Sequence, residues 1–63
     1  MYGIRSSRGW YVRLDEQSNT IFWSDAVPGI LFPCQRSAHA VLQTLQMRME
    51  GDCPEDARVT RLA

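Results

Sequence analysis

The sequence predicts a small α+β domain, in which one amphipathic helix packs on one face of an antiparallel sheet of three to four strands. Two observations lead to this fold. The N-terminal part of the chain contains short runs rich in β-branched and aromatic residues, and turn-forming residues separate them. A later stretch carries apolar residues at the spacing of a single helical stripe, and a short strand-like run follows it. The expected order is β-β-β-α-β.

The length of the chain limits what it can build. It has 63 residues, so we expect a single domain over residues 1–63 with one hydrophobic core. A chain of this size buries only about 60% of the surface that it exposes when unfolded, and the gain from apolar burial nearly cancels the entropy lost on ordering. Little chain remains for a deep active-site cleft. We therefore expect a protein that is not an enzyme, with no cofactor and no bound metal.

Three strands are predicted in the N-terminal part of the chain. The first covers residues 2–5 and the second covers residues 10–14. Residues 6–9 form a compact turn whose glycine can adopt a positive φ. A loop over residues 15–19 has the length and composition of a hairpin connection. It leads to a third strand over residues 20–24, which is rich in β-branched and aromatic residues.

The helix is predicted over about residues 35–50. Its apolar residues form one stripe, made of Ala38, Val41, Leu42, Leu45 and Met49. Cys34 or Ser37 lies near the cap position, and Gly51 ends the helix. A last strand is predicted over residues 58–62, beside the first strand or at the other edge of the sheet.

The open face of the sheet is the best candidate for a functional surface. Alternation in the second strand predicts an inward face made of Trp10, Val12 and Leu14. Tyr11 and Arg13 then point away from the helix. The third strand contains three consecutive large apolar residues at 21–23, so at least one of them also points outward. An exposed aromatic patch of this kind in a small protein usually marks a contact surface.

Three uses of this open face compete: a homodimer interface, a docking surface for another protein, and a platform on which nucleic-acid bases stack. Aromatic residues beside arginines are what single-strand binders use. However, the seven basic residues, all arginine, balance seven acidic residues, and no glycine-flanked aromatic run is present. A polyanion binder normally carries a basic excess. A protein contact is therefore favoured, and a small nucleic-acid-binding module is the alternative.

The predicted partner-binding set consists of Arg5, Arg8, Tyr11, Arg13, Phe22 and Met47. Tyr11 and Phe22 are expected to be aromatic anchors, and the arginines are expected to pair with acidic side chains of the partner. Met47 belongs to a second helix stripe opposite the core stripe, together with Arg36, Ala40 and Gln43. An exposed methionine there is an adaptable apolar contact.

Two other features are weaker candidates for a site. Cys34 at the start of the helix, with His39 five residues later, has the residue types of a nucleophile–base pair. However, the two side chains point in different directions, and no third group orients the histidine. An acidic cluster follows the helix and consists of Glu50, Asp52, Glu55 and Asp56. It either meets an arginine-rich partner or keeps this loop in water.

A set of short patterns spans about residues 10–45. It begins with Trp10-Tyr11-Val12, continues with the run from Ile21 to Ala26, and ends with Phe32, Ala38 and a short amphipathic helix. In this the chain resembles small accessory proteins of bacteriophages and prophages, a group that includes anti-CRISPR proteins. The resemblance implies a non-enzymatic protein that binds and inhibits a host protein or ribonucleoprotein complex. The neutral charge departs from the acidic members of this group that imitate DNA.

The sequence also predicts where the protein is located. The N-terminus lacks the basic segment and long apolar stretch of a secretory signal. No apolar run approaches the roughly 20 residues needed to span a bilayer. We expect a protein of the cytoplasm, that of the host cell if a phage encodes it, with no membrane partner.

Overall fold

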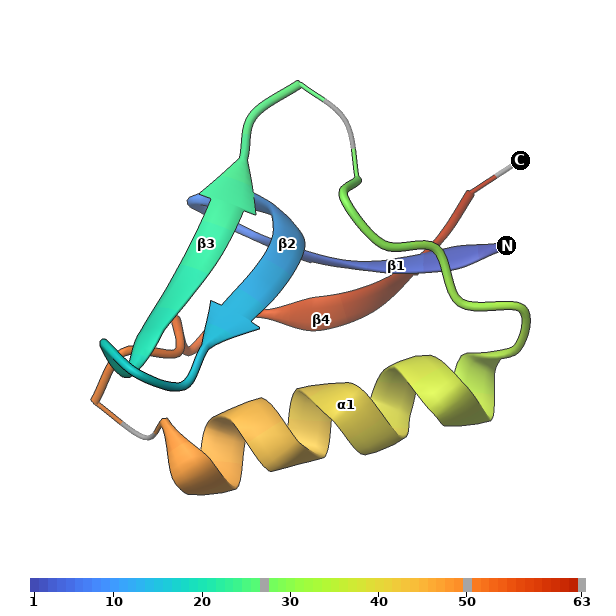
Figure 1. Cartoon of the computed structure of the whole chain (residues 1–63). Helices are drawn as coiled ribbons and strands as arrows, with labels where there is room; N and C mark the ends of the chain where they lie inside the picture. The colour runs from blue at the N-terminus through green and yellow to red at the C-terminus, as the bar shows by residue number, and fades with distance from the viewer. Residues whose placement is uncertain (27, 50, 63) are drawn as a thin grey trace.

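The computed structural model describes residues 1–26, 28–49 and 51–62. The described residues form β1 (Tyr2–Ser6), β2 (Gly9–Asp15), β3 (Thr20–Ser24), α1 (Gln35–Arg48) and β4 (Arg58–Arg61). The strands make one antiparallel sheet in the order β3-β2-β1-β4, and α1 packs on one of its faces (Figure 1). The predicted β-β-β-α-β fold is confirmed. The predicted helix end at Glu50 lies outside the described residues.

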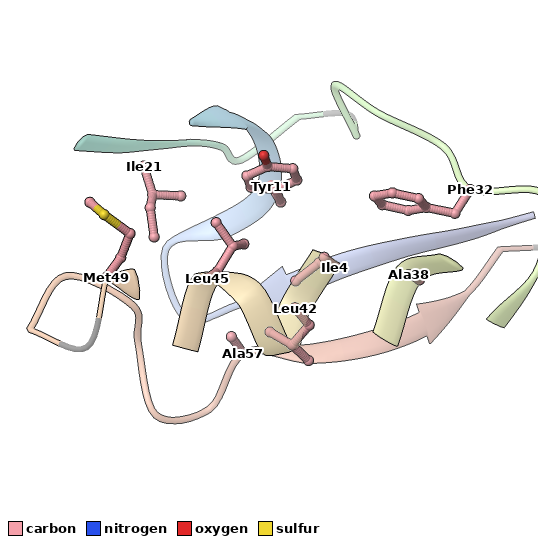
Figure 2. Packing of buried hydrophobic residues seen from close by; sticks show 9 residues of the cluster. All are labelled: Ile4, Tyr11, Ile21, Phe32, Ala38, Leu42, Leu45, Met49 and Ala57. Carbon is pink, nitrogen blue, oxygen red and sulfur yellow. The ribbon is translucent and has the colours of Figure 1, made fainter. Parts of the chain in front are cut away.

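The hydrophobic core lies between α1 and the sheet (Figure 2). The helix contributes Ala38, Leu42 and Leu45, and Met49 follows directly after it. The other buried members of the cluster are Ile4, Tyr11, Ile21, Phe32 and Ala57. Val41 is partly buried against them, so the predicted helical stripe is confirmed in full.

A β-bulge in β2 changes which of its side chains face the helix, compared with the prediction. Tyr11 pairs with Trp23 and Arg13 pairs with Phe22, so the register shifts at Val12. The extra residue keeps Tyr11 and Leu14 on the helix side, although simple alternation would place them on opposite faces. The prediction that Tyr11 points outward is wrong, because Tyr11 is only 6% exposed and packs in the core.

Because of the same bulge, Trp10 also lies on the face opposite to the predicted one. As the strand neighbour of Tyr11, Trp10 points to the face away from α1. Trp10 is buried as expected, but on the wrong side of the sheet for the predicted contact with the helix. Its ring lies over Gly3, where an added Cβ would come within 3.0 Å of two ring carbons. A glycine in β1 thus makes room for the indole.

The segment that leads into α1 is fixed by pairing with the first strand. β1 pairs with β2 only where Arg5 and Ser6 face Trp10 and Gly9. Nearer the N-terminus, Tyr2 exchanges two backbone hydrogen bonds with Phe32, with N···O distances of 2.9 and 2.7 Å. This bridge holds the chain beside β1 just before the helix begins. No helix in the described part of the chain is long and apolar enough to cross a membrane.

Candidate functional site

The sheet face opposite α1 gathers arginine and aromatic side chains. Cross-strand pairing aligns one residue from each strand in a row: Ser24, Trp10, Arg5 and Arg58. Arg13 and Phe22 face each other further along the β2–β3 hairpin. Directly paired residues of antiparallel strands point to the same side of a sheet. We refer to Arg5, Trp10, Arg13, Phe22 and Arg58 as the outer face.

Two arginines of the outer face lie over aromatic rings. The Arg13 guanidinium carbon is 4.3 Å from the centroid of the Phe22 ring, and that of Arg5 is 5.0 Å from the Trp10 ring. Such cation–π contacts contribute about 0.5–1 kcal/mol each at exposed sites. They also restrict the rotamers of long side chains, which lowers the entropy cost of a later binding event.

The arginines of the outer face contribute positive charge, because none of them forms an ion pair within the residues that the structure describes. Within the described ranges, the two ion pairs are Arg8 with Asp52 at 3.8 Å and Arg48 with Glu16 at 3.5 Å. Neither pair includes an arginine of the outer face. Phe22 is 38% exposed, so an apolar ring stands beside this charge. A partner with acidic and apolar side chains matches such a surface.

The structure brings together three of the six predicted binding residues. Arg5, Arg13 and Phe22 all belong to the outer face. Arg8 lies in the β1–β2 turn, where Asp52 engages its guanidinium. Asp52 also accepts a hydrogen bond from the backbone N–H of Ile21 at 3.0 Å, so this carboxylate ties the loop after α1 to the edge of the sheet.

The remaining two predicted residues lie elsewhere. Tyr11 is in the core, where burial raises the pKa of its hydroxyl. Met47 is 75% exposed on α1, and α1 covers the other face of the sheet. Met47 therefore belongs to a surface separate from the outer face. Sequence reasoning missed two residues of the outer face: Trp10, which was expected on the helix side, and Arg58, whose place beside Arg5 depends on the pairing of β4 with β1.

A small polar pocket adjoins the row of paired residues. It has a volume of about 130 Å³ and is lined by Arg5, Ser6, Ser7, Asp56 and Arg58. The Ser7 hydroxyl donates a hydrogen bond to Asp56 Oδ1 at 3.4 Å. Two arginines, one aspartate and two serines therefore line the pocket at the end of the outer face, and the Ser6 hydroxyl is hydrogen-bonded within the β1–β2 turn. These are groups that bind a polar or anionic side chain.

Cys34 is the N-cap residue of α1 and has a different partner from the one a catalytic pair requires. Its Sγ lies 3.2 Å from the Ser37 hydroxyl. Among the described residues, His39 forms no hydrogen bond or ion pair with it. The hydroxyl of Ser37, followed by its backbone N–H, lowers the pKa of the exposed Cys34 thiol. The geometry therefore favours the thiolate of Cys34 through Ser37 and does not pair it with His39.

The two free cysteines are expected to differ in reactivity. Burial, followed by the charge of Asp52, raises the pKa of Cys53. Because the thiolate is the nucleophile, alkylation of Cys34 by iodoacetamide should be faster at pH 7.5 and should reach half its maximal rate at a lower pH. Single-cysteine variants Cys53→Ser and Cys34→Ser isolate the two rates. Equal rates, or a faster Cys53, would contradict the assigned environments.

The acidic cluster after α1 is divided among separate roles. Asp52 accepts a hydrogen bond from the backbone N–H of Ile21 and forms an ion pair with Arg8. Asp56 accepts a hydrogen bond from the Ser7 hydroxyl. Glu50 lies outside the described residues. Among the residues that the structure describes, no group of three His, Cys, Asp or Glu side chains is placed to hold a metal ion.

Comparisons with known proteins add no relative. No protein-family model matches the chain, and neither a curated protein nor a solved structure is found to be similar to it.

Proposed function

We propose that this protein is a small non-enzymatic interaction protein that binds another protein through its outer face. The observation that carries the proposal is the exposed Arg13–Phe22 pair, in which an arginine that joins neither ion pair of the described residues lies 4.3 Å from a partly exposed ring. Aromatic residues and arginine are the residue types that contribute most to binding energy at protein interfaces. From the resemblance to phage accessory proteins, we further propose that the partner is a cytoplasmic host protein or defence complex and that binding inhibits it.

The outer face suits a protein better than a nucleic acid. Single-strand binders need free ring faces on which bases stack. The Trp10 ring is only 7% exposed, and Arg13 covers one face of Phe22. The formal net charge of zero also gives no long-range attraction for a polyanion. An acidic protein surface needs neither free rings nor a net charge, because a few local ion pairs and one apolar contact suffice.

The proposal is tested by affinity capture with matched variants. Tagged wild-type protein, Arg13→Ala/Phe22→Ala and Arg36→Ala/Met47→Ala are incubated in parallel with untreated and nuclease-treated bacterial lysate, and the captured proteins are quantified by mass spectrometry. The second double variant also removes one arginine and one large apolar side chain, but from exposed positions on α1. Circular dichroism establishes that both variants are folded.

The expected result is one stoichiometric protein that wild type and the α1 variant capture equally. The Arg13→Ala/Phe22→Ala variant should bind this protein with an affinity at least about 30-fold lower, because truncating two anchor residues costs about 2 kcal/mol or more of binding free energy. Capture that survives this variant but not the α1 variant would refute the assignment of the surface. Recovery of nucleic acid that disappears with nuclease would favour the nucleic-acid alternative. Self-association alone, lost in the outer-face variant, would assign the face to a homodimer.

A further inference from the structure

The pocket between β1 and β4 is lined by one arginine from each of these strands. Arg5 and Arg58 are direct cross-strand partners, and both line the pocket. Like charges directly opposite each other on neighbouring strands destabilise a sheet. In the described part of the chain, neither arginine has a carboxylate within ion-pair distance. Asp56 in the same pocket offsets one of the two positive charges, and an incoming anion would offset the other.

The pocket also has the size and the charge for one small anionic group. Its volume of about 130 Å³ leaves room for one small group. The two arginines and one aspartate among the lining residues sum to one net positive charge. A single carboxylate neutralises that charge. Guanidinium groups are planar forks that match a carboxylate with two parallel hydrogen bonds.

The neighbouring acids select against a chain of phosphates. Asp56 is inside the pocket, and Glu55 precedes it in the same exposed loop. Asp52 lies in the same loop beside Arg8. A polyanion laid across this site brings further negative charges toward these carboxylates, whereas one isolated carboxylate does not. The Ser7 hydroxyl and Asp56 can also bond the polar backbone groups that flank a carboxylate in a peptide.

We propose that the Arg5–Arg58 pocket binds the side-chain carboxylate of an aspartate or glutamate in a partner protein. The proposal deepens the proposed function: it supposes that the outer face is the binding surface and adds the chemistry that the partner presents there. The acidic residue sits at the β4 end of the outer face. The apolar contact with Phe22 lies towards the opposite edge of the sheet, in β3.

The test uses short peptides and needs no identified partner. The blocked tripeptide Gly-Glu-Gly is titrated into labelled protein at low ionic strength, and the arginine side-chain Nε–H resonances are followed by NMR. We expect saturable shifts for Arg5 and Arg58 in the millimolar range, with none for Arg36 on α1. The isosteric Gly-Gln-Gly peptide should give no saturable shift. Arg58→Gln should weaken binding at least tenfold, whereas Arg61→Gln, on the same strand but outside the pocket, should not.

Three results would overturn the pocket assignment. They are an absence of saturable shifts, equal shifts with the glutamine peptide, and equal weakening by Arg61→Gln. Tighter binding of a short oligothymidylate than of the glutamate peptide, with steep loss on adding salt, would assign the pocket to phosphate instead. These failures are separable from failure of the proposed function. Capture that depends on Arg13 and Phe22 can persist without a carboxylate pocket, and peptide binding can persist when no protein is captured.

Discussion

Gly9→Ala is expected to destabilise the protein by about 2–6 kcal/mol, through backbone strain and overpacking together. Gly9 has a φ of 111°, a conformation that a residue with a Cβ rarely adopts. A Cβ built there lies 2.3 Å from the carbonyl oxygen of Ser24 and 2.6 Å from its carbon. Both contacts are with the backbone of β3, so no side-chain rotation relieves them. The end of β3 has to move away from β2.

Such a loss is comparable with the whole stability of the domain. At about 0.05–0.15 kcal/mol per residue, a chain of this size is stable by about 3–9 kcal/mol. Urea unfolding followed by tryptophan fluorescence measures the change in the midpoint. Gly51→Ala is the matched control, because no atom lies within 4 Å of the added Cβ and its φ is not in the positive range. Unfolding of Gly9→Ala and Gly51→Ala at the same urea concentration would contradict the positive φ of Gly9 and its close approach to the Ser24 backbone.

Leu45→Ala is expected to cost about 2–5 kcal/mol, the range for truncating a buried leucine. Leu45 is 1% exposed and lies at the centre of the helix stripe, with Tyr11 and Ile4 among the core residues around it (Figure 2). The helix supplies only a few buried side chains, so the neighbours cannot close the cavity without moving α1. Much of the variant population should be unfolded at 37 °C.

The measurement is the free energy of unfolding from urea titrations of Leu45→Ala and Gln43→Ala. Gln43 is exposed on the same helix, so its replacement should change stability by less than about 0.5 kcal/mol. Comparable losses for the two variants would show that α1 does not pack on the sheet through the Leu45 side.

The elements of the fold could be predicted because each depends on local sequence. The apolar spacing from Ala38 to Met49 follows a helical period, and the predicted stripe is the one that is buried. The turn at Gly9 follows from a residue type that tolerates positive φ. The third strand has the predicted bounds, because β-branched and aromatic residues end where the polar turn begins.

The faces of the strands were less predictable, because a bulge is a tertiary feature. Strict alternation lets only one of Tyr11 and Leu14 face the helix, whereas the bulge at Val12 lets both pack on the core, Tyr11 buried and Leu14 partly buried. No residue type near Val12 predicts the bulge. The bulge is favoured by tertiary packing, because it adds the Tyr11 ring to the core while Leu14 also stays packed against it.

The candidate site was predictable only in part for the same reason. Arg13 and Phe22 share a face whichever way the hairpin is turned, since they are neighbours across it. Arg58 is far away in the sequence, and only the pairing of β4 with β1 brings it opposite Arg5. The role of Trp10 depends on Gly3, whose missing side chain leaves space for the indole on the outer face.

The central claim is that the outer face is the binding surface. Amide chemical-shift mapping of the labelled protein, with and without the protein that it captures, tests this most directly. We predict that the largest changes fall on Arg5, Arg13, Phe22 and Arg58, while amides around Met47 on the exposed side of α1 change little. The largest changes around Met47, with the outer face unmoved, would contradict the claim and assign binding to the helix side.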